Sequence, residues 1–260
     1  MTGNLKADVP VPPVDEDELQ RFSKALGERP CWAAVSTHDG EELVAARVHR
    51  ALQKFHPDLL TIIVPRHPRR LSRILRDIAG FDMNVAVRSR GEPLHPDTRI
   101  YLADTFGELT AFIAGSAFVI MGGSFAAFGG QNILEVARNG KAVIFGPHMA
   151  NFQDEVQIFL EREAGLQVRD TAKLCAAIAR LLAEPELAEQ MGQNGQRLMQ
   201  NMSDMAERDV DVEGLWTRYG GLVLRRCRQL LRDEEEALDV TQDVLNDVVV
   251  TKEAPNYRID

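Results

Sequence analysis

The sequence predicts an α/β protein with a parallel sheet that helices cover on both faces. Short apolar runs, rich in β-branched and aromatic residues and bounded by turn residues, alternate with amphipathic stretches. In a strand–helix–strand order of this kind, each helix crosses over the sheet and returns the chain to a parallel strand. The predicted strands are Trp32–Val35, Leu59–Val64, Asn84–Val87, Ile100–Ala103, Ala117–Met121 and Ala142–Phe145.

Three amphipathic stretches are predicted as helices. The first, Asp15–Leu26, precedes the first strand and ends at Gly27. The second, Glu41–Phe55, places apolar residues towards one side. The third, Pro68–Ile78, begins with a proline, which the first turn of a helix tolerates.

Composition and charge are those of an ordinary globular protein of 260 residues, with 45% hydrophobic and 27% charged residues. A formal net charge of -9 argues against a broad nucleic-acid-binding face, although a local basic patch is compatible with it. Three cysteines without a CxxC spacing fit a reducing compartment and give no disulfide or zinc framework. With no signal-peptide core and no apolar run of membrane-spanning length, we expect a cytoplasmic protein without a membrane span.

A glycine-rich segment, Met121–Glu135, follows the fifth predicted strand and reads MGGSFAAFGGQNILE. Its glycines let the backbone approach a ligand, and the unpaired amides that open the following helix are donors for an anion such as phosphate. Glu135 is placed to direct its carboxylate at a neighbouring diol, as an acidic residue does for ribose in dinucleotide folds. A glycine-rich turn packed against the sheet explains the same residues equally well, because the spacing is neither GxGxxG nor a Walker loop.

Polar or glycine-bearing loops follow five of the predicted strands and, in a parallel sheet, meet at one edge. They are Ser36–Glu42, Pro65–Pro68, Asp104–Glu108, the glycine-rich segment and Gly146–His148. Arg66 and His67 either contact an anionic group or form a helix-entry turn with solvated charges, and the sequence favours neither. Thr105 and Glu108 have the spacing of a capping box, which favours simple helix capping over ligand binding there.

The histidines show no metal-ligand spacing, and neither a GxSxG motif nor a Cys/His pairing indicates a covalent nucleophile. His49 and His56 are interpreted as surface residues. The sequence therefore indicates ligand binding without a metal and identifies no catalytic residue.

Seven motifs, in this order along the chain, resemble the carboxyl-terminal half of 3-deoxy-D-manno-octulosonic acid (Kdo) transferase. They are Gly3–Lys6, Ser36–Glu42, Pro65–Pro68, Arg88–Glu92, Asp104–Leu109, Gly122–Ser124 and Gly129–Glu135. The resemblance covers about residues 2–197. It implies a Rossmann-like fold, the carboxyl-terminal domain of a GT-B glycosyltransferase. Enzymes of that family move Kdo from CMP-Kdo to a lipid A precursor during lipopolysaccharide synthesis.

The resemblance also implies three groups of contacts with CMP-Kdo, which is a donor substrate and not a cofactor. The residues are Pro65 and Arg66; Phe106, Gly107 and Glu108; and Asn132, Ile133, Leu134 and Glu135. Arg66 and backbone amides are expected to hold the phosphate, Glu135 the ribose hydroxyls, and the backbone near Phe106 to Glu108 the cytosine edge. Gln131 and Val136 stand where the family usually has histidine and proline. The Gln131 side chain can donate a hydrogen bond but cannot carry a positive charge. The affinity for CMP-Kdo, or the turnover, is therefore expected to differ from that of family members with histidine at this position.

The family's amino-terminal domain supplies the acceptor groove, the membrane-proximal surface and the proposed general base, and this chain starts at the linker that follows it. Residues 1–200 are therefore expected to bind CMP-Kdo but to transfer it poorly alone. Only through the missing domain would they reach the lipid A precursor, at the cytoplasmic face of the inner membrane.

Residues 201–260 are predicted as a helical tail. The segment 213–245 resembles the start of region 2 of an extracytoplasmic-function sigma factor, which contributes polymerase-facing helices. An amphipathic helical hairpin with one buried face explains the pattern without such a function, and we favour it. Two functions therefore remain: the donor-binding domain of a glycosyltransferase, and a transcription-associated interaction protein whose tail contacts RNA polymerase.

Overall fold

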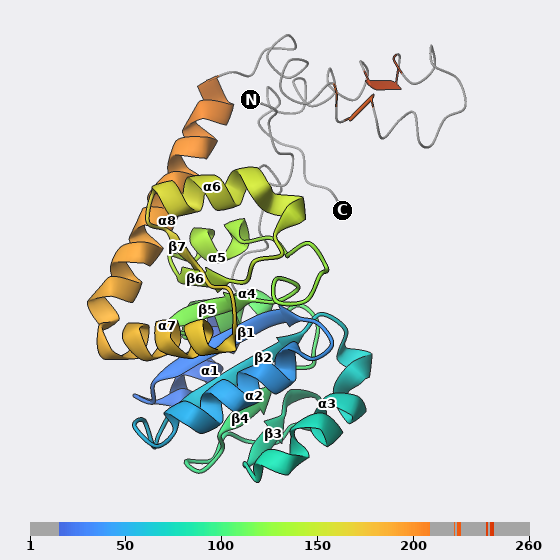
Figure 1. The fold of residues 1–260 in the computed structure, drawn as a ribbon, viewed down its shortest axis with the longest axis vertical. Coiled ribbons are helices and arrows are strands. Elements are labelled where there is room, and N and C mark those ends of the chain that lie inside the picture. The colour runs from blue at the N-terminus through green and yellow to red at the C-terminus, as the bar shows by residue number, and fades with distance from the viewer. Residues whose placement is uncertain (1–15, 209–220, 222, 225–237, 239, 242–260) are drawn as a thin grey trace. The chain divides into compact units, whose positions relative to one another are not determined.

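The computed structural model describes residues 16–208 and six single residues farther along, at 221, 223, 224, 238, 240 and 241. Residues 16–199 belong to one compact unit built on a seven-stranded sheet (Figure 1). The strand order is β3-β4-β2-β1-β5-β6-β7, and every neighbouring pair is parallel. The predicted α/β fold with a parallel sheet is confirmed.

The six predicted strands are all present, and their ends differ from the prediction by at most two residues. The strands are β1 (Cys31–Thr37), β2 (Leu60–Pro65), β3 (Val85–Val87), β4 (Ile100–Leu102), β5 (Phe118–Met121), β6 (Ala142–Phe145) and β7 (Gly165–Gln167). The sequence does not predict β7, because Leu166 is its one large apolar side chain. Its pairing with β6, in which Val143 lies opposite Gly165, gives it a place at the sheet edge.

The predicted helices correspond to the first three of the eight helices in residues 16–208. The helices are α1 (Glu16–Leu26), α2 (Glu41–Leu52), α3 (Leu71–Ile78), α4 (Leu109–Gly115), α5 (Leu134–Arg138), α6 (Gln153–Glu161), α7 (Thr171–Ala183) and α8 (Pro185–Arg208). Short 3-10 turns are η2 (Pro68–Arg70), η3 (Ala79–Phe81), η4 (Arg88–Arg90) and η5 (Ala150–Phe152). The predicted third helix is thus divided into η2 and α3, and the second ends three residues early, at Leu52.

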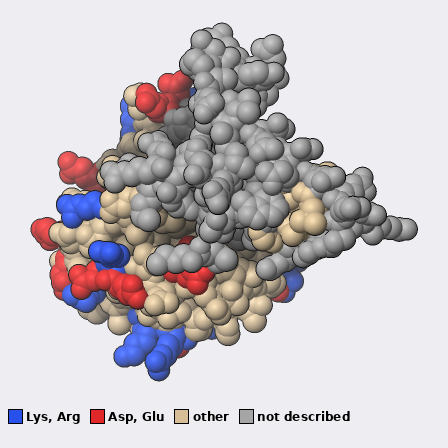
Figure 2. All heavy atoms as spheres, turned by 90° about the horizontal axis from the view of Figure 1, so that it is seen from above, with Lys and Arg blue, Asp and Glu red and all other residues tan. Residues whose placement is uncertain are grey.

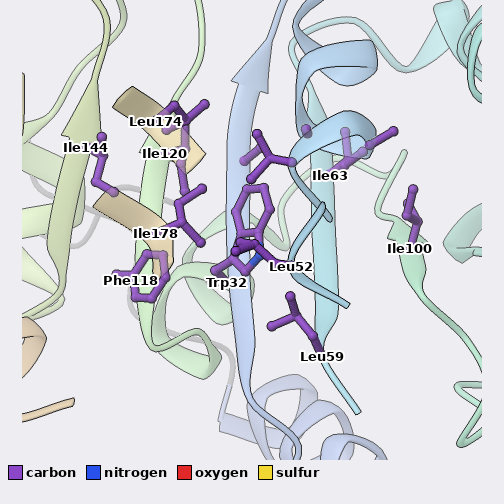
Figure 3. Packing of buried hydrophobic residues seen from close by; sticks show 14 of the residues in the cluster. Trp32, Leu52, Leu59, Ile63, Ile100, Phe118, Ile120, Ile144, Leu174 and Ile178 are labelled. Atoms are coloured by element: carbon purple, nitrogen blue, oxygen red, sulfur yellow. The ribbon is translucent and has the colours of Figure 1, made fainter. Parts of the chain in front are cut away.

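Alternate side chains of the central strands enter two apolar layers. Trp32 and Phe118 belong to the layer beneath α2, α3 and α7 (Figure 3). On the other face, Phe22 of α1 and Phe112 of α4 meet edge to face with 5.4 Å between ring centroids, and Tyr101 of β4 packs beside both. Because helices cover both faces, the groups that a ligand can reach lie in the loops at the ends of the strands.

His49 is fully buried, so its interpretation as a surface residue is wrong. The ring lies on the inner side of α2, and its Nδ1 is 2.8 Å from Thr61 Oγ1 on β2. Burial lowers the pKa of His49 to about 4, so the ring is neutral at pH 7. His56, the other histidine of this pair, is partly exposed.

The sigma-factor-like segment 213–245 lies almost entirely outside the described residues, and so does the first motif, Gly3–Lys6. The helical tail and the domain division between residues 200 and 201 therefore stay predictions. In the described part of the chain, no helix has the length and apolar character to cross a bilayer, and no group of three metal-ligating side chains is assembled. Figure 2 shows acidic and basic residues intermixed on the described part of one face.

Candidate functional site

The carboxyl ends of β1 and β5 are neighbours at the point where the strand order reverses. The crossover connections that follow β1 and β5 run to opposite sides. This opens a crevice at the carboxyl ends of the strands. The loop after β2 joins the loop after β1, because the Arg66 N–H donates to the Thr37 carbonyl at 3.0 Å. The glycine-rich segment joins them, because the Gly122 N–H donates to the Val35 carbonyl at 2.8 Å. The predicted convergence of these loops is confirmed.

The chain leaves β1 through a bulge at Ser36. Ser36 has a φ of 53°, which is uncommon for a residue other than glycine, and the β1–β2 register shifts between Val35 and Thr37. Gly122 lies against the bulge, because a Cβ at this position would be 2.4 Å from the Ser36 carbonyl oxygen. A side chain at Gly122 would therefore displace the backbone that leads from β1 to His38.

The glycine-rich segment is bound by a carboxylate of the protein itself. Glu41, the buried first residue of α2, accepts N–H groups from Gly123 at 2.7 Å, Phe125 at 3.0 Å and Ala126 at 3.4 Å. The same carboxylate accepts the His38 N–H at 2.8 Å. The segment does use its amides to bind an anion, but in this structure the anion is Glu41.

The helix after the glycine-rich segment also differs from the prediction. α5 has five residues and begins at Leu134, so Glu135 lies in its first turn. The Leu134 N–H donates to Asn132 Oδ1 at 3.1 Å. The expectation that unpaired amides open this helix is therefore wrong for Leu134.

Ser124 anchors the glycine-rich segment to the loop after β6. Its buried hydroxyl donates to the Met121 carbonyl at 2.5 Å and accepts the Gly146 N–H at 2.8 Å. The Ser124 carbonyl accepts the His148 N–H at 2.9 Å. The segment is therefore fixed at both sides of the crevice by the protein alone.

A second carboxylate, Glu42, joins the loops after β1 and β2. The Arg70 guanidinium donates to both of its oxygens, at 2.8 and 3.0 Å, and Thr37 Oγ1 donates to it at 2.8 Å. Arg70 also reaches Asp39 at 3.3 Å. A bidentate pair of this kind fixes geometry as well as charge, so the crevice is preorganised.

Pro65 and Arg66 lie together at the end of β2. Pro65 is buried as the last residue of the strand, whereas Arg66 is exposed. Within the described residues, the Arg66 guanidinium has no hydrogen-bond or ion-pair partner, so it is a cation available to an anionic ligand. The backbone of Arg66 also leads into the η2 turn. The alternative interpretation, a helix-entry turn with solvated charges, therefore fits this residue equally well.

Phe106, Gly107 and Glu108 form the loop before α4. Thr105 and Glu108 do not form the capping box that their spacing indicates. Glu108 itself occupies the N-cap position and makes no side-chain cap. Its carboxylate instead pairs with Arg88 Nη2 at 2.6 Å and accepts the Thr105 hydroxyl, and the Arg88 hydrogen bond raises the pKa of that guanidinium. A ligand at this loop therefore meets the Phe106 ring, which is 83% exposed, and backbone groups.

The last group of predicted residues, Asn132–Glu135, contains two buried side chains and one half-buried carboxylate. Ile133 and Leu134 are buried in the core, so they can meet a ligand only through their backbone. Burial raises the pKa of Glu135. The charge of Arg138 and a hydrogen bond with Thr110 partly offset this rise. Glu135 is thus held near the start of α4, beside the Phe106 loop.

His38 is a site residue that the sequence reasoning missed. Its ring stacks on Phe128 with 4.2 Å between centroids, and its Nε2 is 3.3 Å from Gln131 Nε2. The His67 ring stands edge-on at 6.0 Å. The signal that could have identified His38 is its position directly after β1, the central strand at the crevice.

An open groove of about 740 Å³ lies beside the glycine-rich segment, and none of the predicted contact residues lines it. Phe128, the loop after β6 and the outer side of α6 form its walls, without any Asp, Glu, Lys or Arg. The predicted residues therefore belong to the crevice and not to this groove.

The fold and the crevice define a Rossmann-like domain of the GT-B type, and comparison with solved structures supports that class. The fold matches the C-terminal CMP-Kdo binding domain of WaaA from Acinetobacter baumannii with a TM-score of 0.67 and 29% sequence identity, over 71% of this chain and 99% of that one.

The particular proteins that the chain is similar to are Kdo transferases. It is 33% identical over 218 residues to 3-deoxy-D-manno-octulosonic acid transferase of Haemophilus influenzae, covering 82% of this chain and 50% of the relative. It is 32% identical over 221 residues to that of Bordetella pertussis, covering 83% and 51%. The chain thus spans about half the length of these curated relatives. No family model matches the chain. The resemblance to Kdo transferase is confirmed as a similarity, whereas the sigma-factor resemblance gains no support.

Proposed function

We propose that this chain is the donor-binding domain of a Kdo-transferring glycosyltransferase and that CMP-Kdo binds at the carboxyl edge of its sheet. The observation that carries the proposal is the preorganised crevice, in which fixed loops present the unpaired cation Arg66 and the half-buried carboxylate Glu135. The match to a solved CMP-Kdo binding domain supports the same ligand.

Each part of the nucleotide has a matching group in this proposal. Arg66 takes an anionic group of the donor, because a planar guanidinium binds phosphate in two-point fashion. Glu135 accepts hydrogen bonds from the ribose hydroxyls. Backbone groups of Phe106, Gly107 and Glu108 face the cytosine edge, since the Glu108 carboxylate is already paired with Arg88.

Transfer of the sugar requires an acceptor held against the bound donor. Fixing two reactants in one geometry contributes roughly 7–11 kcal/mol to catalysis. We propose that a second domain, corresponding to the other half of the relatives, presents a lipid A precursor at the cytoplasmic face of the inner membrane. No feature of the described residues favours the second hypothesis, contact of the tail with RNA polymerase.

Calorimetric titration of the full chain with CMP-Kdo tests the donor-binding proposal. Glu135→Ala is expected to weaken binding about 10- to 100-fold, because two hydrogen bonds from ribose hydroxyls to a carboxylate are lost. The matched control is Glu28→Ala, which removes an exposed carboxylate before β1, at the opposite edge of the sheet. Failure of the wild-type chain to bind, or equal affinity of the two variants, would contradict the proposal.

A further inference from the structure

Resting on the proposed function, we propose that Arg88 is a positioning residue for the loop that faces the nucleobase, and that Glu18 links the position of this loop to helix α1. Arg88 acts through the carboxylate of Glu108 and does not itself contact the nucleotide.

The loop before α4, residues 104–108, is held at both of its ends by side chains of the η4 turn. Arg88 donates from Nη2 to Glu108 Oε1 at 2.6 Å and from Nε to both Glu108 oxygens at 3.2 Å. Ser89 donates its N–H to one oxygen of Asp104 at 2.9 Å and its hydroxyl to the other at 2.6 Å. The residues between these two anchors are therefore placed by η4, which lies about 15 to 20 residues earlier in the chain.

Helix α1 supplies a second carboxylate to the same guanidinium. Glu18, in the first turn of α1, is buried, and its Oε1 accepts from Arg88 Nη2 at 2.5 Å. Phe22, one turn later, lies so close to Gly115 at the end of α4 that a Cβ there would be 2.6 Å from the ring. α1 thus packs directly on α4 and, through Arg88, reaches the loop that leads into α4.

The position of Arg88 between two carboxylates explains why its loss would move the loop. Without the cation, Glu18 and Glu108 face each other as like charges, which raises the energy of both. Glu108 also has an alternative partner, because it occupies the N-cap position of α4 without making a side-chain cap. Released from Arg88, its carboxylate is attracted to the amides that open α4, and the backbone of the loop turns with it.

A shift of this loop affects recognition of the base more than binding of the rest of the nucleotide. In the proposed function, backbone groups of the loop face the cytosine edge. Cytosine presents an amino donor and a ring-nitrogen acceptor where uracil presents a carbonyl acceptor and an N–H donor. A site whose hydrogen-bonding groups are fixed rejects the wrong base, because the wrong base leaves these groups unpaired. Arg88 is therefore expected to control selectivity for the base.

Calorimetric titrations of the full chain with CMP and with uridine monophosphate (UMP) measure this selectivity. The wild-type chain is expected to bind CMP at least about tenfold more tightly than UMP. In Arg88→Gln the preference is expected to fall to about threefold or less. The matched control is Arg90→Gln, which changes an arginine of the same η4 turn that is 52% exposed and lies 3.6 Å from Glu92. This control is expected to keep the full preference.

A double-mutant cycle tests the link to α1. Glu18→Gln keeps the size of the side chain but removes its charge, and it is expected to lower the preference for CMP about two- to threefold. Added to Arg88→Gln, it is expected to change the preference no further, because Glu18 reaches the loop only through Arg88. An unchanged preference in Glu18→Gln, or a loss that adds to that of Arg88→Gln, would show that α1 is not linked to the loop in this way.

The ratio of the two affinities separates positioning of the loop from a general effect on folding. If Arg88→Gln keeps the preference for CMP, or loses affinity for CMP and UMP equally, the inference is wrong while the proposed function stands. A wild-type chain that binds CMP and UMP alike would also overturn it. If the wild-type chain binds neither nucleotide, both the inference and the proposed function fail.

Arg88→Lys provides the same test if Arg88→Gln does not fold. Lysine keeps the positive charge but lacks the planar fork that bonds two carboxylates at once. Its preference for CMP is also expected to fall to about threefold, and a preference equal to that of the wild-type chain would contradict the role of the Arg88 geometry.

Discussion

Glu41→Gln is expected to lower the free energy of unfolding by about 3 kcal/mol and to abolish the ordered form of the glycine-rich segment. The carboxylate accepts four N–H groups, two on each oxygen. A glutamine offers one acceptor oxygen and points an NH₂ group at donors, so two of these four N–H groups lose their partner. Denaturant unfolding at pH 7.5 measures the loss.

Glu28→Gln is the control for this experiment, because Glu28 is exposed and makes no comparable set of contacts. It is expected to change stability by no more than about 0.5 kcal/mol. If Glu41→Gln unfolds at the same denaturant concentration as this control, Glu41 does not hold the segment as described.

Gly122→Ala is expected to cost about 3 kcal/mol and to lower the affinity for CMP more than tenfold. The new Cβ would lie 2.4 Å from the Ser36 carbonyl oxygen and 2.6 Å from Thr37 Cα, and both atoms are backbone. One of the two loops must therefore move, and both border the crevice. Unfolding curves and calorimetric titration with CMP measure the two effects.

Gly80→Ala tests whether the effect is specific to this close approach. A Cβ at Gly80 meets nothing within 4 Å, and the residue does not have a positive φ. Its replacement is expected to leave stability within about 1 kcal/mol of the wild-type value. A Gly122→Ala chain as stable and as active in binding as Gly80→Ala would show that the bulge at Ser36 adapts freely.

Much of the sheet could be predicted because a strand covered on both faces has a simple local signature. In β2, all six residues of LTIIVP are buried, and the run is apolar apart from Thr61. β7 lacks that signature and is defined by its pairing with β6. His49 was misjudged because a histidine resembles a surface residue until its hydrogen bond to Thr61 on another element is known.

The site could be predicted as a set of converging loops but not as a set of contacts. Glu41 lies 82 residues from Gly123, and Arg88 lies 20 residues from Glu108. Local rules for helix starts and capping boxes consider only neighbours in the chain, so they assign the glycine-segment amides to a ligand and Glu108 to a cap. In the structure Glu41 accepts three amides of the glycine-rich segment, and Arg88 pairs with Glu108.

The most direct test of the central claim, that a cytidine nucleotide binds in the crevice, is a nuclear magnetic resonance titration of the ¹⁵N-labelled full chain with CMP. The amide resonances of Gly129–Glu135 and of His38 are expected to shift in a saturable way, while that of Glu28, at the opposite edge of the sheet, stays in place. Unmoved resonances of Gly129–Glu135 at saturating CMP would contradict the account.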